Sequence, residues 1–148
     1  YKKNNKTISS TFIRKKIRAG KIELVNKLLN RQWCVEGRVV KGKKRGRKIG
    51  FPTCNMRLDS YVIPKLGVYA VKVNGKNFNK NGIANIGYRP TFNGQSLLLE
   101  TNIFGINKIL YNKVIKISFK KFLRPEKKFK NFEHLKKQIK HDIKRAKN

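Results

Sequence analysis

The sequence predicts a mainly β protein, a small antiparallel barrel or sandwich, with a covering helix at its C-terminus and a short helical extension at its N-terminus. Three observations lead to this fold class. Short apolar segments with alternating side chains follow one another closely from residue 33 onward. Asn-Gly turn signals lie among them. Apolar residues at helical spacing occur only before and after this region.

The N-terminal segment 8–30 is predicted to form two short helices. Ser9 or Ser10 can cap the first helix, and Ile13 and Ile17 lie one turn apart on the same face. Gly20 is expected to end this helix. A second helix then carries the apolar residues Ile22, Val25, Leu28 and Leu29.

The predicted strands cover 33–40, 67–73, 97–103 and 114–119, and segment 76–88 continues the sheet between the second and third of them. In 114–119 the side chains of Ile115, Ile117 and Phe119 alternate onto one side. Asn74-Gly75 and Asn81-Gly82 are each typical of a tight turn between strands.

The C-terminal segment is predicted to be a helix that begins after Asn131 as N-cap. Its apolar stripe, expected to cover the sheet, consists of Phe132, Leu135, Ile139 and Ile143. The tail 141–148 is expected to have a solvated polar face, and Asp142 to be a surface charge.

Composition limits the classes of function. The chain has 38 Lys and Arg against 7 Asp and Glu, a formal charge of +31, which favours nucleic acids, anionic membranes or phosphorylated ligands as partners. However, the lysines are spread along the whole chain among Asn and Ile, which is also what a genome-wide compositional bias produces. No apolar run approaches the ~18 residues that a spanning helix needs.

Two further features bear on context. Cys34 and Cys54 are too few for a disulfide framework and lack neighbouring metal ligands, so we expect reduced thiols in a cytoplasmic protein. Because the sequence begins at Tyr1 rather than Met, we expect it to be part of a longer chain.

Glu100 is the acidic residue of most interest. It interrupts the apolar segment 97–103 on the same face as Leu98, and a carboxylate buried among leucines is costly unless it is paired or functional. Two interpretations remain open: an edge-strand charge that faces water, or a general base aimed into a site. Glu126 follows Arg124-Pro125 and can pair with Arg124.

The segment "KGKKRGRKIGFPTCN", residues 41–55, combines glycines, cations and oxygen-bearing side chains. Glycine lets backbone N–H groups approach a phosphate closely, the cations supply charge, and a proline stiffens the exit. Thr53 and Asn55 present two oxygens on one side of an extended segment, which suits Mg²⁺. A basic glycine-rich hairpin without a ligand is the alternative. The loop residues that would meet phosphates are Gly42, Lys44, Gly46, Arg47, Gly50 and Pro52.

Several motifs in order resemble the riboflavin kinase family. "GFPTCN" is similar to the family's Gly-Phe-Pro-Thr-Ala-Asn signature, with Cys54 in place of alanine. "LGVYAVKV", "GIANIGYRPTF", "LLLETNIF", "FLRPEKKF" and "LKKQIKHD" follow in the family's order, so the resemblance covers about residues 33–146. "ISSTFIR", residues 8–14, looks like the last signature of the FMN adenylyltransferase domain that precedes the kinase domain in bifunctional bacterial enzymes.

The resemblance implies a six-stranded Greek-key barrel with a covering helix. It implies an enzyme, a riboflavin kinase that transfers the γ-phosphate of ATP to the 5′-hydroxyl of riboflavin and gives FMN and ADP. Carried over, Thr53 and Asn55 would bind Mg²⁺ and phosphates, Gly42 to Gly50 would cover the nucleotide, and Glu100 would take the ribityl proton. Arg124 would lie near the flavin-side loop.

The resemblance further implies that residues 1–30 are a helical remnant of the adenylyltransferase domain and that 31–148 are the kinase domain. No adenylyltransferase activity is expected, because that domain's His-x-Gly-His site is absent. As a fragment, the chain is expected to be monomeric. In the flavin-side loop, residues 104–113, the family's acids are missing and Asn112 stands in place of a glycine that a left-handed backbone would favour.

Two other functions remain as alternatives. One is a basic β-barrel that serves as a nucleic-acid-binding module. The other is a kinase fold that persists as a flavin-binding protein without catalysis. For a kinase, nucleic acid is expected to bind only nonspecifically, through charge.

Overall fold

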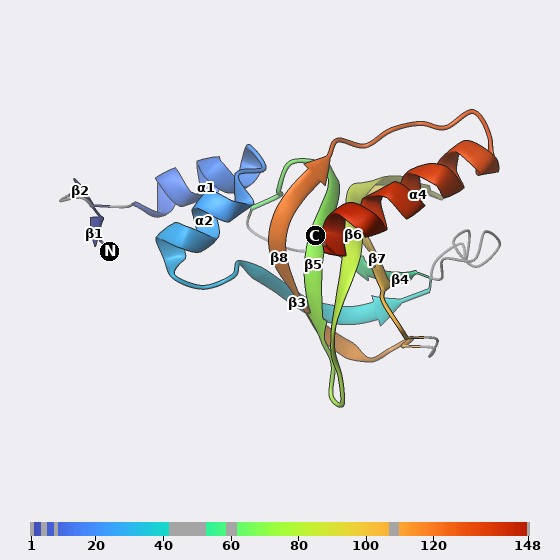
Figure 1. The fold of residues 1–148 in the computed structure, drawn as a ribbon, viewed down its shortest axis with the longest axis horizontal. Helices are drawn as coiled ribbons and strands as arrows, with labels where there is room; N and C mark the ends of the chain where they lie inside the picture. The colour runs from blue at the N-terminus through green and yellow to red at the C-terminus, as the bar shows by residue number, and fades with distance from the viewer. Residues whose placement is uncertain are drawn as a thin grey trace.

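The computed structural model describes residues 9–41, 53–58, 62–106 and 110–147, together with two short paired strands, β1 (Lys2–Lys3) and β2 (Lys6–Thr7). Two short helices, a six-stranded barrel and a final helix follow in chain order (Figure 1). The predicted loop residues Gly42, Lys44, Gly46, Arg47, Gly50 and Pro52 lie outside the described residues.

The barrel is closed and every neighbouring pair of its strands is antiparallel, which confirms the predicted fold. Its strands run in the order β3-β4-β7-β6-β5-β8, so β4–β7 and β5–β8 are neighbours in space but not along the chain. The strands are β3 (Cys34–Val40), β4 (Cys54–Arg57), β5 (Gly67–Asn74), β6 (Asn79–Thr91), β7 (Gly94–Ile103) and β8 (Val114–Arg124).

Alternate residues of the strands fill the barrel interior, because successive side chains of a strand point to opposite faces. The interior is mainly apolar, and the expected row of Ile115, Ile117 and Phe119 lies in it with exposures of 2% or less. Tyr69 packs edge-on against Phe119, with ring centroids 5.1 Å apart. Cys34 and Cys54 are both thiols, as expected.

The final helix, α4 (Phe132–Lys147), packs on the outside of the barrel against a second apolar cluster, and Figure 1 shows it crossing β5 and β6. Asn131 accepts a hydrogen bond from the backbone N–H of His134, so it caps this helix as predicted. The cluster consists of Val68, Ala70, Ile83, Leu123 and Ala146, with Phe104, Ile139 and Ile143 against it. Phe132 was predicted to be part of the covering stripe, but it is 51% exposed.

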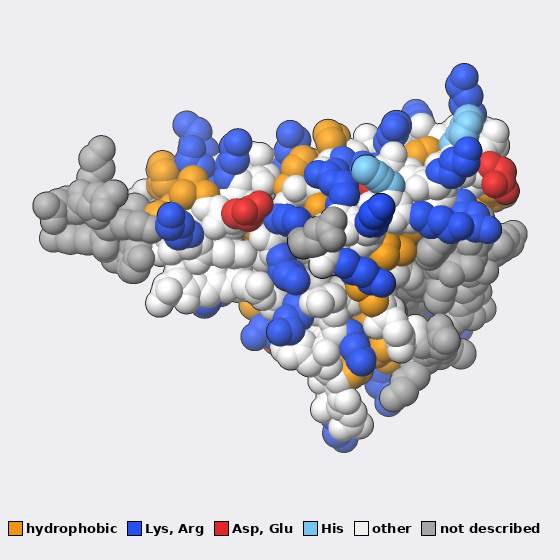
Figure 2. Space-filling model, in the orientation of Figure 1, with side chains coloured by type: hydrophobic (Ala, Val, Ile, Leu, Met, Phe, Trp, Pro, Cys, Tyr) orange, Lys and Arg blue, Asp and Glu red, His pale blue; other side chains and the backbone are white. Residues whose placement is uncertain are grey.

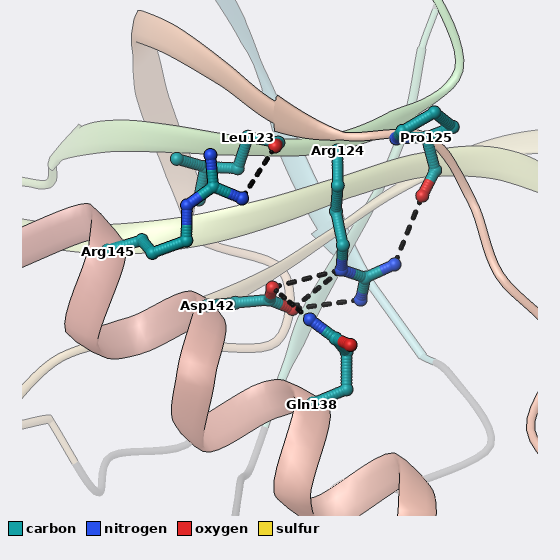
Figure 3. A network of polar contacts seen from close by, with 6 residues as sticks. All are labelled: Leu123, Arg124, Pro125, Gln138, Asp142 and Arg145. Carbon is teal, nitrogen blue, oxygen red and sulfur yellow. Dashed lines mark hydrogen bonds and ion pairs between the residues drawn. The ribbon is translucent and has the colours of Figure 1, made fainter.

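Asp142 on α4 is 1% exposed, so the expectation of a surface charge is wrong (Figure 3). Both of its oxygens accept hydrogen bonds from Arg124 at the end of β8, at 2.8 to 3.1 Å, and Gln138 donates a further one. Nearby, Arg145 donates to the carbonyl oxygen of Leu123. These polar contacts and the apolar cluster together fasten α4 to the barrel.

The two N-terminal helices, α1 (Ser10–Arg18) and α2 (Ile22–Leu29), form as predicted, with Ser9 as the N-cap of α1. Gly20, which lies between them, has a φ of 77°. The amide of Asn26 on α2 donates to the carbonyl oxygen of Phe119 and accepts from the N–H of Trp33. The helical extension is therefore joined to the barrel by polar contacts as well as by packing.

One predicted turn is wrong. Asn74-Gly75 does lie at the β5–β6 hairpin, where Gly75 donates to the carbonyl oxygen of Phe78. Asn81-Gly82, by contrast, lies within β6, where Gly82 pairs with both Val71 and Ile103. A Cβ at Gly82 would stand 2.3 Å from a backbone oxygen of β7, so this glycine permits close strand approach.

Candidate active site

A row of polar side chains crosses three neighbouring strands on the outside of the barrel. Glu100 on β7 pairs in register with Asn55 on β4 and with Asn85 on β6. Residues directly opposite each other in antiparallel strands place their side chains on the same face. The adjacent row of Met56, Leu99 and Ile86 is in the core, so Asn55, Glu100 and Asn85 are on the outer face.

Thr53 extends this group of oxygen-bearing side chains. It directly precedes β4 and lies two residues before Asn55, a spacing that returns an extended chain to the same side. Asn55 is only 8% exposed although it is on the outer face, and Thr53 is half-buried. The structure thus places Asn55 directly beside Glu100 on the neighbouring strand, and Thr53 two residues before Asn55.

Glu100 is neither buried without a partner nor simply turned toward water. Its side chain is 27% exposed, and its Oε1 accepts a hydrogen bond of 2.7 Å from Nε of Arg89 on β6. Nη1 of Arg89 also donates to Oε1 of Glu126 at 3.1 Å. Glu126 therefore pairs with Arg89, and the expectation that it pairs with Arg124 is wrong.

The carboxylates of Glu100 and Glu126 stabilise the protonated form of Arg89. Partial burial of the guanidinium works to lower the pKa of Arg89, but attraction to Glu100 and the hydrogen bond with Glu126 outweigh it and raise the pKa above its usual value. The cation is therefore permanent at the centre of this Glu100–Arg89–Glu126 group.

The residues present fit a magnesium ion. Side-chain oxygens of Thr53 and Asn55 are the hard ligands that Mg²⁺ prefers. In addition, Oδ1 of Asn85 is buried and has no hydrogen-bond partner, although buried polar atoms are usually paired. An oxygen in that condition beside Glu100 is consistent with a site that a hydrated cation or a phosphate-bound cation completes. No cluster of three His, Cys, Asp or Glu suited to a metal occurs among the described residues.

Arg124 lies apart from this group. It ends β8, three strands from β7 in the barrel order, and it pairs with Asp142 of α4. Its Nη1 also donates to the carbonyl oxygen of Pro125 (Figure 3). These contacts assign Arg124 a part in fastening α4, and its predicted place near flavin stays a prediction.

The described part of the loop between β7 and β8 agrees with one expectation. Asn112 has a φ of 65°, which is the left-handed conformation. We expected this conformation here, because Asn112 stands where the family has a glycine. Its N–H donates to the carbonyl oxygen of Val39, and its own carbonyl oxygen accepts from Arg38. Tyr111 beside it is 49% exposed, and Nζ of Lys41 lies 5.1 Å from its ring centroid.

Sequence reasoning missed Asn85 and Arg89 as parts of the site. Both belong to the motif "GIANIGYRPTF", residues 82–92, to which no role was assigned for either side chain. For Asn85 the signal is register: once β6 and β7 are aligned through the turn at 92–93, Asn85 falls opposite Glu100. Arg89 falls opposite Ser96, on the same face of β6, and its long side chain reaches along the sheet to Glu100.

The fold is thus a closed six-stranded barrel with a covering helix, and its outer face carries a row of one carboxylate and two amides, Glu100, Asn55 and Asn85. Residues 29–148 match the family model described as riboflavin kinase. The chain belongs to the riboflavin kinase family.

Three similar proteins place the match in context. A bifunctional riboflavin kinase/FMN adenylyltransferase of Bacillus subtilis is 44% identical over 148 residues, which cover 96% of this chain and 46% of that protein. A riboflavin kinase structure from Trypanosoma brucei has a TM-score of 0.55 at 22% identity, covering 77% of this chain and 76% of its own, and supports the fold. A Streptococcus pneumoniae structure described as a macrolide-efflux protein has a TM-score of 0.90 at 33% identity, covering 99% of this chain and 48% of its own.

The chain thus spans about half the length of the curated relatives it matches. In the ranges that the structure describes, none of the helices is both long and apolar enough to cross a membrane.

Proposed function

We propose that this chain transfers the γ-phosphate of ATP to the 5′-hydroxyl of riboflavin, giving FMN and ADP, and that it is the kinase part of a bifunctional flavin-synthesising enzyme. The observation that carries the proposal is the row of Asn55, Glu100 and Asn85 on the outer face of a barrel of this family. Residues 1–30 would belong to the preceding adenylyltransferase domain, whose activity we do not expect from this chain.

Glu100 is the proposed general base. Its carboxylate accepts the proton of the 5′-hydroxyl while the hydroxyl oxygen bonds to the γ-phosphorus and the bond from that phosphorus to the β–γ bridging oxygen breaks. ADP carries away the electron pair of the broken bond. Phosphoryl transfer depends mainly on positioning and charge neutralisation, so one carboxylate that orients the hydroxyl is sufficient.

Thr53 and Asn55 would hold Mg²⁺ together with the phosphates of ATP, and the unpaired oxygen of Asn85 supports a ligand at this place. The ion would neutralise charge that develops on the phosphate oxygens. The glycines and cations of 42–50 would cover the nucleotide, and Arg124 would contribute on the flavin side. We also propose a monomeric chain in the cytoplasm, where its two thiols would stay reduced.

The test is to incubate the purified chain with riboflavin, ATP and Mg²⁺ and to separate the flavins by chromatography. FMN without FAD is the expected product. The absence of FMN, with riboflavin still bound, would favour the inactive flavin-binding alternative, and FAD formation would contradict the loss of the adenylyltransferase activity.

A further inference from the structure

Arg89 links the candidate base to a second acidic side chain. Its guanidinium donates through Nε to Glu100 at 2.7 Å and through Nη1 to Glu126 at 3.1 Å, and Nη1 also donates to the carbonyl oxygen of Tyr88 at 2.9 Å. These groups come from β7, from the segment after β8, and from β6 itself. The guanidinium is thus held at both Nε and Nη1, which limits the orientations in which it can donate to Glu100.

The carboxylate of Glu126 occupies a space that is open only because residue 87 is a glycine. A Cβ at Gly87 would stand 1.9 Å from Oε1 of Glu126 and 2.8 Å from Nη1 of Arg89. Gly87 and Arg89 are two residues apart on β6, so they share a face of that strand. The absence of a side chain at position 87 therefore leaves the space in which Glu126 and Arg89 meet.

Contribution to folding stability is a poor explanation for this arrangement. The side chains of Arg89, Glu100 and Glu126 are 30%, 27% and 34% exposed, and ion pairs at such exposure stabilise a fold only slightly. Orientation of a reacting group, in contrast, acts directly on the rate, because a misplacement of about 1 Å can cost ~10²-fold. The hydrogen bond from Nε goes to Oε1 of Glu100, which leaves Oε2 for a substrate hydroxyl.

We propose that Arg89 is a positioning residue for the phosphoryl transfer: it holds Glu100 by Oε1 so that Oε2 faces the 5′-hydroxyl of the flavin substrate, and Glu126 holds Arg89 in that orientation. This inference rests on the proposed function, in which Glu100 is the base. Arg89 itself touches neither substrate nor phosphate in this role.

The experiment is a double-mutant cycle. Arg89→Gln is made in the wild-type chain and in a Glu100→Gln chain, and kcat, the KM for riboflavin and for ATP, and the melting temperature are measured for all four proteins. In the wild-type background kcat is expected to fall by ~10 to 10²-fold, with both KM values within about twofold. In the Glu100→Gln background Arg89→Gln should lower the remaining kcat less than about twofold, because a residue that acts only through Glu100 has nothing left to orient.

Three further variants separate positioning from a structural role. Arg89→Lys keeps the positive charge but loses the planar guanidinium that donates to Glu100 and Glu126 at once, so it should recover only part of kcat. Glu126→Gln leaves both Arg89 and Glu100 in place and should lower kcat by less than Arg89→Gln does. Arg18→Gln, a distant exposed arginine of α1, is the matched control and should behave as wild type.

Several outcomes would overturn the proposal. A normal kcat in Arg89→Gln would remove any role for Arg89 in the reaction. An equally large loss in the Glu100→Gln background would show that Arg89 acts independently, for example on a phosphate, and a loss confined to KM would assign it to ligand binding. Failure of the proposed function would show in different measurements. The wild-type chain would form no FMN, or Glu100→Gln alone would have a normal kcat. Either result would also contradict the role proposed for Arg89.

Discussion

Glu100 carries the chemical step of the proposed reaction, and its removal is the most direct test at the scale of a residue. Glu100→Gln keeps the size of the side chain and one oxygen that can accept a hydrogen bond from Arg89, but it cannot accept the ribityl proton. We expect kcat for FMN formation to fall by ~10²–10⁴-fold, the usual contribution of a general base. Steady-state assays at saturating riboflavin and ATP measure this.

The control for this variant is Glu36→Gln, which neutralises an exposed carboxylate on β3. It should leave kcat unchanged, because it changes the charge of the chain by the same amount without touching the site. A Glu100→Gln chain as active as this control would contradict the assignment of the base.

Thr53 is expected to act on the nucleotide rather than on the flavin. Thr53→Ala removes one proposed oxygen ligand, and loss of a hydrogen bond or ligand to a charged group typically weakens binding by about 10 to 10²-fold. Titration calorimetry with a nonhydrolysable ATP analogue should show this loss with Mg²⁺ present and little difference with EDTA.

Thr53→Ser keeps the hydroxyl and is the matched control, which should bind Mg-ATP nearly as the wild type does. If Thr53→Ala and Thr53→Ser bind the analogue equally well, the hydroxyl has no part in holding the metal or the phosphates.

At the scale of elements, one buried ion pair contributes to the attachment of α4. Asp142 is 1% exposed and Arg124 is 15% exposed at the side chain. Asp142→Ala would leave the guanidinium of Arg124 without its carboxylate, and breaking a buried ion pair from one side costs about 3–5 kcal/mol. We expect the free energy of unfolding, measured by urea denaturation, to fall by about that amount.

Lys140→Ala is the control on the same helix, because Lys140 is exposed and its loss should change stability by no more than about 0.5 kcal/mol. A loss below about 1 kcal/mol in Asp142→Ala would mean that the apolar cluster alone fastens α4.

The elements also show why part of the fold could be predicted from sequence. The helices, their caps and the alternating strand 114–119 follow from local spacing, which one sequence displays directly. Asn81-Gly82 misled the turn prediction because a glycine needed for close approach of two strands looks the same as a turn glycine. Only the pairing partner distinguishes the two, and that partner lies on β7.

One sequence displays local spacing but not contacts across the sheet, and this also determines which residues of the candidate site could be selected from it. Thr53, Asn55 and Glu100 could be selected from residue type, spacing and resemblance. Asn85 and Arg89 could not, since Asn85 is brought to Glu100 by cross-strand register and Arg89 by the reach of its side chain from its place opposite Ser96. For Asp142 a signal did exist: it lies three residues after Ile139 and four before Ala146, on the face that packs against the barrel.

For the whole molecule, charge is the dominant property. The chain carries a formal +31, and Figure 2 shows Lys and Arg scattered over the visible face rather than gathered in one patch. Among the described acids, Glu100, Glu126 and Asp142 each pair with an arginine. The charge that remains is therefore a general cationic surface, which attracts polyanions without reading their sequence.

The last prediction separates this surface from the site. We expect the chain to bind single-stranded RNA with no sequence preference. Affinity should fall steeply with salt, by ~3 × 10²-fold or more between about 50 and 200 mM if six or more phosphates are contacted. Fluorescence anisotropy with two RNAs of equal length and different sequence, over a series of KCl concentrations, measures both properties. FMN formation near 200 mM KCl should be unchanged by added RNA, because the outer site on β4, β6 and β7 would be occupied by flavin and nucleotide. If the chain instead distinguishes the two RNAs and still binds near 200 mM KCl, a nucleic-acid-binding module is supported. If RNA inhibits FMN formation at that salt, the RNA binds at the site itself.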